Sequence, residues 1–361
     1  MKKIIFHVAE VALSQQSGMG RVAWHWKNEF EQRGYDFVHI GPAEVGSLLH
    51  KGLFPNAAYQ TYKRCGRVAS LLLVHEPASG AFINQDVPTV VFSHGVERRA
   101  WNLALNGKDG TNKKISWRTK VFFPLWRLRQ CDLGLRKAVK LLLINEEDRV
   151  FTEKYYHRKS QDIYVFKNGI NKLTLNEIIQ PKDQITVGFL GSWIERKGIR
   201  TLVEAAQILY EQGWRLNWLL AGTNVDSESV LKFFPSNLHS SVEIIQCFDP
   251  ENEESILARC NIFVLPSFFE GQSLALLQAM AAGRCCITTN CCGQRDLIQN
   301  GDNGLLYEPG NACELAFLIE QCLKDEQLRL NLGRNAKLLV KDRSWKTVSD
   351  EVVDQIEKVL L

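Results

Sequence analysis

The feature that most restricts the fold of this chain is a regular alternation of strand-like and helix-like segments. Short apolar runs predict strands, and the longer amphipathic segments between them predict helices. In the first half of the chain the predicted strands are residues 3–9, 36–40, 70–75, 89–93 and 141–145. This alternation predicts a parallel sheet covered by helices on both faces.

The pattern breaks at Asn168-Gly169, a strong turn signal, and a polar linker follows through residue 183. It restarts with predicted strands at residues 185–190, 216–221, 242–246, 262–265 and 285–289 and helices at 198–212 and 274–282. The tail from Ser344 has the apolar spacing of one more helix. We therefore expect two Rossmann-like α/β domains, residues 1–168 and 169–343, that face each other across a cleft, with residues 344–361 as a C-terminal helix.

Composition agrees with two ordinary domains, since 45% of the 361 residues are hydrophobic and 23% are charged. The apolar N-terminal run resembles a signal peptide, but it is short and is interrupted by His7 and Glu10, so a buried strand is expected. No stretch is long and uncharged enough to span a bilayer. The ten cysteines include no C-x-x-C pair, and we expect reduced thiols in a cytoplasmic protein with no metal site.

One segment, residues 113–129, concentrates positive charge and aromatic rings although the net charge of the chain is only +4. Such a mixture can hold a helix at an anionic membrane surface, here the inner face of the plasma membrane, or bind a negatively charged acceptor. A solvated amphipathic helix packed on its own domain is the alternative. No nucleic-acid-binding motif accompanies the segment, so nucleic acid is not an expected partner.

Residues 261–283 have the pattern of a strand, a polar turn and a helix. The turn contains Glu270 and then Gln272, Ser273 and Leu274, where the helix begins. Free amides and the helix dipole favour a phosphate at such a helix start. Glu270 stands just before it, where a carboxylate can accept hydrogen bonds from a sugar.

A second strand-to-helix turn, residues 191–198, contains Gly191 and the basic pair Arg196-Lys197. Arginine offers a planar fork and lysine a compact charge to a diphosphate. An exposed basic loop is the alternative, but the flanking glycines and the other anion site favour ligand binding.

The first domain offers two weaker candidates. Gly18-Met19-Gly20 follows the first strand, and its amides can form an anion-binding nest. It fits a dinucleotide fingerprint, but the preceding loop is long and the second strand ends without an acidic residue, so we reject that function. His94 ends a strand, where it can bond a substrate oxygen or move a proton, although a structural histidine is the alternative.

Three motifs are absent from the chain: Asp-x-Asp, the P-loop and the G-x-S-x-G elbow. Their absence gives no support to a metal–diphosphate site of that type, a P-loop NTPase or a serine hydrolase.

Taken together, these motifs resemble the retaining GT-B glycosyltransferases called group 1, which include glycogen-synthase-like and mannosyltransferase-like enzymes. The resemblance runs over almost the whole chain. Its parts are residues 187–198, the signature 266–283, the glycine turn 301–306 and the hinge 165–171.

The resemblance implies transfer of a hexose from a nucleotide diphosphate sugar, bound by the second domain, to a glycan or lipid-linked saccharide on the first. Arg196 and Lys197, with amides at Gln272, Ser273 and Leu274, would neutralise the diphosphate, and Glu270 would hold sugar hydroxyls. His94 would lie near the reacting sugar. The amides of Gly18, Met19 and Gly20 would close over the phosphates, and no metal or other cofactor is expected.

The chain departs from the family pattern in three places. Gln278 replaces the second signature glutamate, which bonds the ribose in relatives, and glutamine keeps one acceptor oxygen but loses the charge. Cys292-Gly293 replaces a Gly-Gly pair, and Asp296 replaces a glutamate. We expect an active enzyme. The alternatives are a non-hydrolysing nucleotide-sugar epimerase of the same fold and a weakened binding or regulatory homologue.

Overall fold

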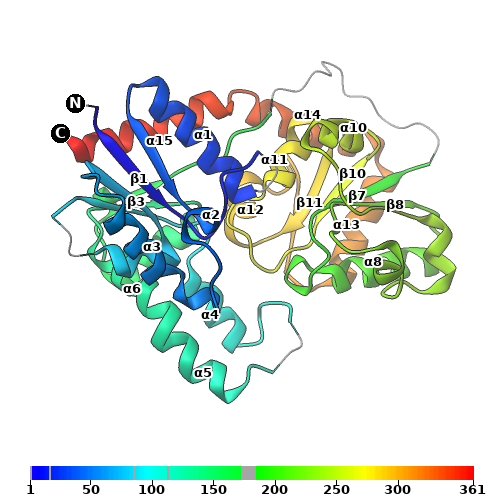
Figure 1. Cartoon of the computed structure of the whole chain (residues 1–361). Helices are drawn as coiled ribbons and strands as arrows, with labels where there is room; N and C mark the ends of the chain where they lie inside the picture. The colour runs from blue at the N-terminus through cyan, green and yellow to red at the C-terminus, as the bar shows by residue number, and fades with distance from the viewer. Residues whose placement is uncertain (1, 16–17, 84–85, 112–113, 172–183) are drawn as a thin grey trace. The chain divides into compact units, whose positions relative to one another are not determined.

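The computed structural model describes residues 2–15, 18–83, 86–111, 114–171 and 184–361. Lys113 and the predicted linker from residue 172 to 183 therefore lie outside the described residues. The chain divides into two compact α/β units (Figure 1). Unit 1 contains Met1–Asn106, Lys113–Asn168 and Trp345–Leu361, and unit 2 contains Gly107–Asn112 and Gly169–Ser344.

The described part of unit 1 forms a parallel sheet of six strands in the order β2-β1-β3-β4-β5-β6. The central strands are buried apolar runs, as expected when helices cover both faces of a sheet. The strands are β1 (Ile4–Val8), β2 (Asp36–Ile40), β3 (Leu71–His75), β4 (Thr89–Phe92), β5 (Lys140–Leu143) and β6 (Ile163–Val165).

Helices cover both faces of the unit 1 sheet, and α3 packs its apolar side against β1 and β3. A π-helical turn, Pro124–Leu128, joins α5 to α6. The helices are α1 (Gly18–Gln32), α2 (Pro42–Val45), α3 (Phe54–Arg64), α4 (Glu97–Leu105), α5 (Trp117–Phe123), α6 (Arg129–Lys137), α7 (Glu146–Tyr156) and α15 (Trp345–Leu360).

The C-terminal helix α15 packs beside α1 of unit 1 (Figure 1). Arg33, just after α1, bonds three carboxylates of α15: Asp350 at 2.7 Å, Asp354 at 2.6 Å and Glu357 at 2.9 Å. Lys346 of α15 in turn bonds Glu29 of α1 at 2.7 Å. The chain thus ends in the unit in which it began.

Unit 2 also forms a parallel sheet of six strands in its described part, in the order β12-β11-β10-β7-β8-β9. Counted within the unit this is the order 3-2-1-4-5-6 of a Rossmann sheet. The strands are β7 (Thr186–Leu190), β8 (Asn217–Ala221), β9 (Val242–Ile245), β10 (Ile262–Leu265), β11 (Cys285–Thr289) and β12 (Leu305–Tyr307).

Two apolar cores lie on opposite faces of the unit 2 sheet. One joins the sheet to α8 and α13, and the other joins it to α10, α11 and α14. Alternate side chains of β10 pack into the two cores, since Val264 belongs to the first and Phe263 to the second. The helices are α8 (Ile199–Glu211), α9 (Ser227–Leu231), α10 (Glu253–Ala258), α11 (Leu274–Ala281), α12 (Cys292–Leu297), α13 (Ala312–Lys324) and α14 (Glu326–Val340).

Most predicted strands are found within one or two residues of their predicted bounds. Helix α1 starts at Gly18, the first residue of the predicted Gly18-Met19-Gly20 turn. Two strands, β6 and β12, were not predicted, because each has only three residues. The ten cysteines, all within the described ranges, form no disulfide. In the same ranges, every helix is too short or too polar to span a bilayer.

Candidate functional site

The carboxyl ends of β7 and β10 lie side by side at the point where the strand order of unit 2 reverses. Ligands of open α/β sheets bind in the crevice outside such a switch point. The loop after β7 contains Gly191 and the basic pair, and the loop after β10 contains Glu270. The topology therefore brings together the two turns that the sequence singles out.

One backbone bond and one side-chain bond join these two loops. The Phe268 amide donates to the Arg196 carbonyl at 3.0 Å, and the Arg196 guanidinium donates to the Phe269 carbonyl at 2.5 Å. Gly198 has a φ of 72°, and a Cβ atom there would lie 1.9 Å from the Pro266 oxygen. Only glycine fits this position, so a side chain would force the loops apart.

Lys197 and Glu270 form an ion pair in which Nζ lies 2.5 Å from Oε1. Arg196 adds a second positive charge, 3.9 Å from the same oxygen. Burial alone raises the pKa of the Glu270 carboxyl, but the charges of Lys197 and Arg196 outweigh burial and hold the pKa below its ordinary value. Glu270 is thus an ionised, buried carboxylate beside two cations.

Helix α11 begins directly after this pair. The Ser273 hydroxyl caps it by accepting a hydrogen bond from the Leu276 amide at 3.3 Å. Gln272 and Ser273 are buried, and Leu274 is the first helical residue. The positive end of the helix dipole therefore lies next to the cations, which makes the region suitable for an anion.

Gln278 lies on α11 and is only 2% exposed. Its Nε2 atom has no hydrogen-bond partner among the described residues. A buried donor without a partner costs about 1–3 kcal/mol. An oxygen atom of a ligand could satisfy this donor, a property that a glutamate at this position would lack.

The loop after β11 supports the same turn from the other side. Thr289 donates to the Ser267 carbonyl at 2.6 Å. A Cβ atom on Gly293 would lie 1.9 Å from the Gly271 oxygen, so glycine is required there. Cys292 has a φ of 52°, a left-handed conformation that a non-glycine residue adopts at a cost.

In unit 1 the strand order reverses between β1 and β3. Gly18, Met19 and Gly20 follow β1 as the first residues of α1. Met19 is exposed and Gly20 is buried. Arg21 fixes the preceding loop by donating to the Gln15 carbonyl at 2.7 Å. The predicted phosphate-closing turn is thus the start of a helix at a switch point.

His94 lies in the turn between β4 and α4 and is half-buried. Its ring contacts the edges or faces of Phe92, His75 and Phe166 with centroids 5.7–5.8 Å away. Burial lowers the pKa of His94 to about 4, so its imidazole is neutral at neutral pH. A neutral imidazole can donate one hydrogen bond and accept another.

Glu76, which follows β3, holds both ends of the His94 turn. It accepts a hydrogen bond from the Ser93 hydroxyl at 2.6 Å and one from the Glu97 amide at 3.1 Å. Burial, together with the nearby Glu97 charge, raises its pKa to about 8. From the sequence, His75-Glu76-Pro77 is a candidate similar to His94 but weaker, and no role for the Glu76 carboxyl was predicted.

The strand ends of unit 1 are otherwise rich in neutral histidines. His7, His39 and His75 lie near one another, with His7 Nδ1 2.9 Å from His39 Nδ1. Burial is the main cause that lowers the pKa of each. Within the described ranges, no group of three or more histidine, cysteine or acidic residues is arranged to hold a metal ion.

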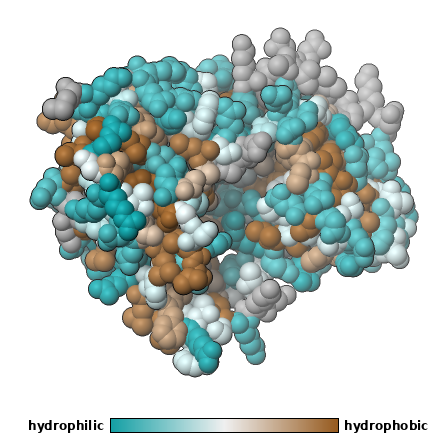
Figure 2. Space-filling model, in the orientation of Figure 1, coloured by the Kyte–Doolittle hydropathy of each residue, from teal (hydrophilic) through white to brown (hydrophobic). Residues whose placement is uncertain are grey.

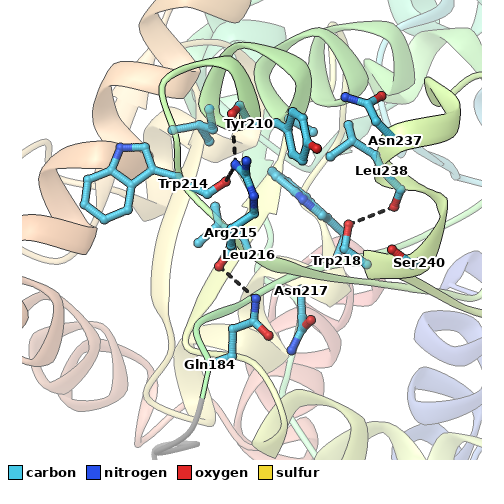
Figure 3. Close-up of a pocket in the computed structure, with 13 residues that line it drawn as sticks. Gln184, Tyr210, Trp214, Arg215, Leu216, Asn217, Trp218, Asn237, Leu238 and Ser240 are labelled. Carbon is cyan, nitrogen blue, oxygen red and sulfur yellow. Dashed lines mark hydrogen bonds between the residues drawn. The ribbon is translucent and has the colours of Figure 1, made fainter.

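A hollow of about 320 Å³ in unit 2 lies at the opposite edge of the sheet, at the amino ends of β7 and β8 (Figure 3). Trp218, Leu238 and Arg215 line it, and Arg215 is fixed by bonds to the carbonyls of Tyr210 and Trp214. Gln184 donates to the Arg215 carbonyl at 2.8 Å. It is remote from the switch point and contains none of the predicted site residues.

Two doubly wound sheets, with polar side chains gathered at each switch point, define a two-domain α/β protein of the GT-B class. Residues 172–339 match the sequence model of Glycosyl transferases group 1.

Two curated relatives have glycosyltransferase names. An uncharacterised glycosyltransferase of Methanocaldococcus jannaschii, MJ1178, is 26% identical over 68% of this chain and 64% of its own length. The capsular polysaccharide biosynthesis glycosyltransferase CapM of Staphylococcus aureus is 30% identical over 50% of this chain and 47% of its own. The matches thus span about half to two thirds of these relatives.

Solved structures resemble the whole chain in fold. Sucrose-phosphate synthase from Thermosynechococcus elongatus has a TM-score of 0.81 at 17% identity, covering 99% of both chains. HepE from Anabaena, solved with UDP and glucose, has a TM-score of 0.72 at 16% identity, covering 99% of this chain and 100% of its own.

Proposed function

We propose that the protein is a retaining glycosyltransferase that moves a hexose from a nucleotide diphosphate sugar to a glycan or lipid-linked saccharide acceptor, without a metal ion. The observation that carries the proposal is the cluster of Arg196, Lys197 and Glu270 at the switch point of unit 2. This cluster lies inside the segment that matches the group 1 glycosyltransferase model.

The charges of the cluster suit the cleavage of a sugar–phosphate bond. Positive charge develops on the sugar and negative charge on the departing diphosphate. Arg196, Lys197 and the start of α11 offer fixed donors to that negative charge, which is often the largest catalytic contribution. Glu270 holds Lys197 in place, and a bound diphosphate would share the lysine with it.

In the proposed reaction the bond between the sugar C1 and the diphosphate oxygen breaks, and an acceptor oxygen bonds to C1 on the same face. The acceptor proton passes to the leaving diphosphate, so atoms and charge balance. Glu270 would orient sugar hydroxyls, and Gln278 would donate to the ribose. The neutral His94 would bond a sugar oxygen, and Gly18, Met19 and Gly20 would offer amides to the phosphates.

The comparisons support the substrate classes in the proposal. HepE, a protein of the same fold, has been solved with UDP and glucose, and CapM has a name from capsular polysaccharide biosynthesis. We extend both to this chain as a proposal: a nucleotide diphosphate sugar as the donor and a growing polysaccharide or glycolipid as the acceptor.

Calorimetric titration with UDP, GDP and ADP, with no metal added, tests the donor site. We expect one nucleotide to bind, and Arg196→Ala and Lys197→Ala each to weaken binding about 10- to 100-fold, since a hydrogen bond to a charged group contributes ~1.5–3 kcal/mol. Arg200→Ala is the matched control, because Arg200 pairs with Glu195 rather than Glu270. If the wild type binds none of the three, the donor assignment is wrong.

Turnover separates the proposal from its two alternatives. A glycosyltransferase releases nucleotide diphosphate faster when an acceptor is supplied. An epimerase changes the donor sugar with no acceptor, and a regulatory homologue binds nucleotide without turnover. Absence of turnover with every donor, combined with rescue by Gln278→Glu, would mean that the glutamine has disabled the site.

A further inference from the structure

Helix α5 and the π-helical turn after it, Pro124–Leu128, expose an unusual set of large apolar side chains. Trp117, Phe122 and Leu125 are 69%, 59% and 66% exposed, and Val121 and Trp126 are also exposed. We call these five residues the α5 face. They recur at helical spacing on one continuous stretch, so they form one surface rather than scattered contacts. Figure 2 shows apolar atoms gathered along α5.

The α5 face stays exposed because the helix is anchored through other groups. The Phe123 ring stacks on Trp101 of α4 at 4.7 Å between centroids, which fixes the packed side of the helix. The Trp126 indole donates to the Gly52 carbonyl at 2.8 Å, so even this exposed ring has its polar edge satisfied. The apolar side chains therefore cannot turn inward without breaking these contacts.

Basic side chains surround the α5 face. Lys114, Arg118, Lys120 and Arg129 are exposed and form no ion pair in the part of the chain that the structure describes. By contrast, Arg127 pairs with Glu10 and Glu97 and serves the fold. Between residues 110 and 131 the sequence contains no acidic residue. The surface is thus both apolar and uniformly positive.

We propose that the α5 face docks on an anionic lipid surface. Trp117, Phe122 and Leu125 insert among the acyl chains and headgroups, while Arg118 and Lys120 contact the negative headgroups. Lipid fits both halves of the surface, because interfacial helices combine an apolar face with flanking bases. A soluble polyanion would use the bases but leave the apolar side chains in water, and an ordinary solvated helix would not expose them.

The test is co-sedimentation of the full chain with vesicles of neutral phosphatidylcholine, with and without about a third of phosphatidylglycerol, at low and high salt. We expect binding to the anionic vesicles that weakens as salt rises. Arg118→Gln/Lys120→Gln should weaken it about 25-fold at low salt, since each base near an anionic surface strengthens binding about fivefold. Trp117→Ala/Phe122→Ala/Leu125→Ala should weaken it at least tenfold.

Matched controls use groups that are equally exposed but lie elsewhere. Phe317→Ala/Leu338→Ala removes exposed apolar side chains of α13 and α14, and Lys154→Gln/Lys159→Gln removes two exposed charges of unit 1. Both controls should sediment as the wild type does. Circular dichroism of every variant should match the wild type, because the altered side chains make few contacts.

Two outcomes overturn the proposal. One is a wild type that stays in the supernatant with anionic vesicles at low salt. The other is sedimentation that depends on Arg118 and Lys120 but not on Trp117, Phe122 and Leu125, which would show that charge alone attracts the protein and that the apolar side chains do not insert. The lipid-docking proposal does not depend on the donor site, because nucleotide binding is measured without lipid and the two proposals can fail separately.

Discussion

Each unit has a switch point at the carboxyl ends of its parallel strands. The side chains near the switch point are charged in unit 2 and mostly neutral in unit 1. In unit 2 the strand ends hold an ionised carboxylate between two cations. In unit 1 they hold neutral imidazoles and a carboxyl whose pKa is raised to about 8. Fixed charge suits a diphosphate, whereas neutral donors and acceptors suit sugar hydroxyls. The two groups of side chains thus differ in the ligand chemistry that they suit.

The largest expected effect comes from breaking the charged site. Lys197→Met leaves Glu270 buried without its main partner, which should cost about 3–5 kcal/mol in the free energy of unfolding. Lys197→Met/Glu270→Leu should recover most of that loss, as measured by urea denaturation. Lys232→Met is the control, because its pair with Glu228 is exposed and should not matter measurably.

The same pair has a predictable pH dependence. Because the folded-state pKa of Glu270 is lowered, its stabilisation is present above the ordinary carboxyl pKa and is lost as pH falls through the folded value. The difference between wild type and Lys197→Met should therefore shrink in acid. A difference that grew in acid would contradict the ion pair.

In unit 1, Glu76 should make the free energy of unfolding depend on pH in the opposite sense. The folded-state pKa of Glu76 is raised to about 8, so its contribution is fully present below the ordinary carboxyl pKa and is lost as pH rises toward 8. We expect the free energy of unfolding to fall over this window by up to about 1.4 kcal/mol per pH unit. Glu76→Gln should flatten that slope, whereas the exposed Glu31→Gln should retain it.

A smaller effect concerns His94 itself. Because burial lowers its pKa to about 4, its NMR signals should not titrate between pH 5 and 8. Its contribution to stability is then lost as pH falls from the ordinary histidine value toward 4, because the unfolded chain takes up the proton first. His94→Gln identifies the signals. A midpoint near neutrality would show that the imidazole is charged in the folded protein.

The smallest effect separates stability from binding at Gln278. Gln278→Leu removes a buried donor that lacks a protein partner, so we expect a gain of about 1 kcal/mol in stability. Nucleotide affinity should fall by several fold in calorimetry, because the ribose loses the same donor. A variant that lost both stability and affinity would indicate that Gln278 is bonded within the protein.

How much the sequence predicts differs between local and distant features. The alternation of apolar runs predicts ten of the strands, and Ser273 predicts the start of α11, because these signals lie within one element. Strands β6 and β12 are not predicted, since a strand of three residues shows no periodicity. The Lys197–Glu270 ion pair is also not predicted. Its partners are far apart along the chain and meet only through the pairing of β7 with β10.

The role of Glu76 was missed for a related reason. Its bonds to Ser93 and Glu97 depend on β3 lying next to β4, and its raised pKa depends on burial, which composition does not reveal. The exposure of the α5 face is likewise a tertiary property, although its mixture of rings and bases is visible in the sequence. Sequence motifs identify candidate groups, and strand order decides which of them meet.

The return of α15 to unit 1 has a consequence for how the protein is made. Arg33 is synthesised before residues 169–344, but its partners Asp350, Asp354 and Glu357 are synthesised after them. The chain from Gly169 to Ser344 is therefore an insertion within unit 1. Residues 169–344 can fold during translation before residues 345–361 are made, whereas unit 1 is complete only when residues 345–361 have joined it.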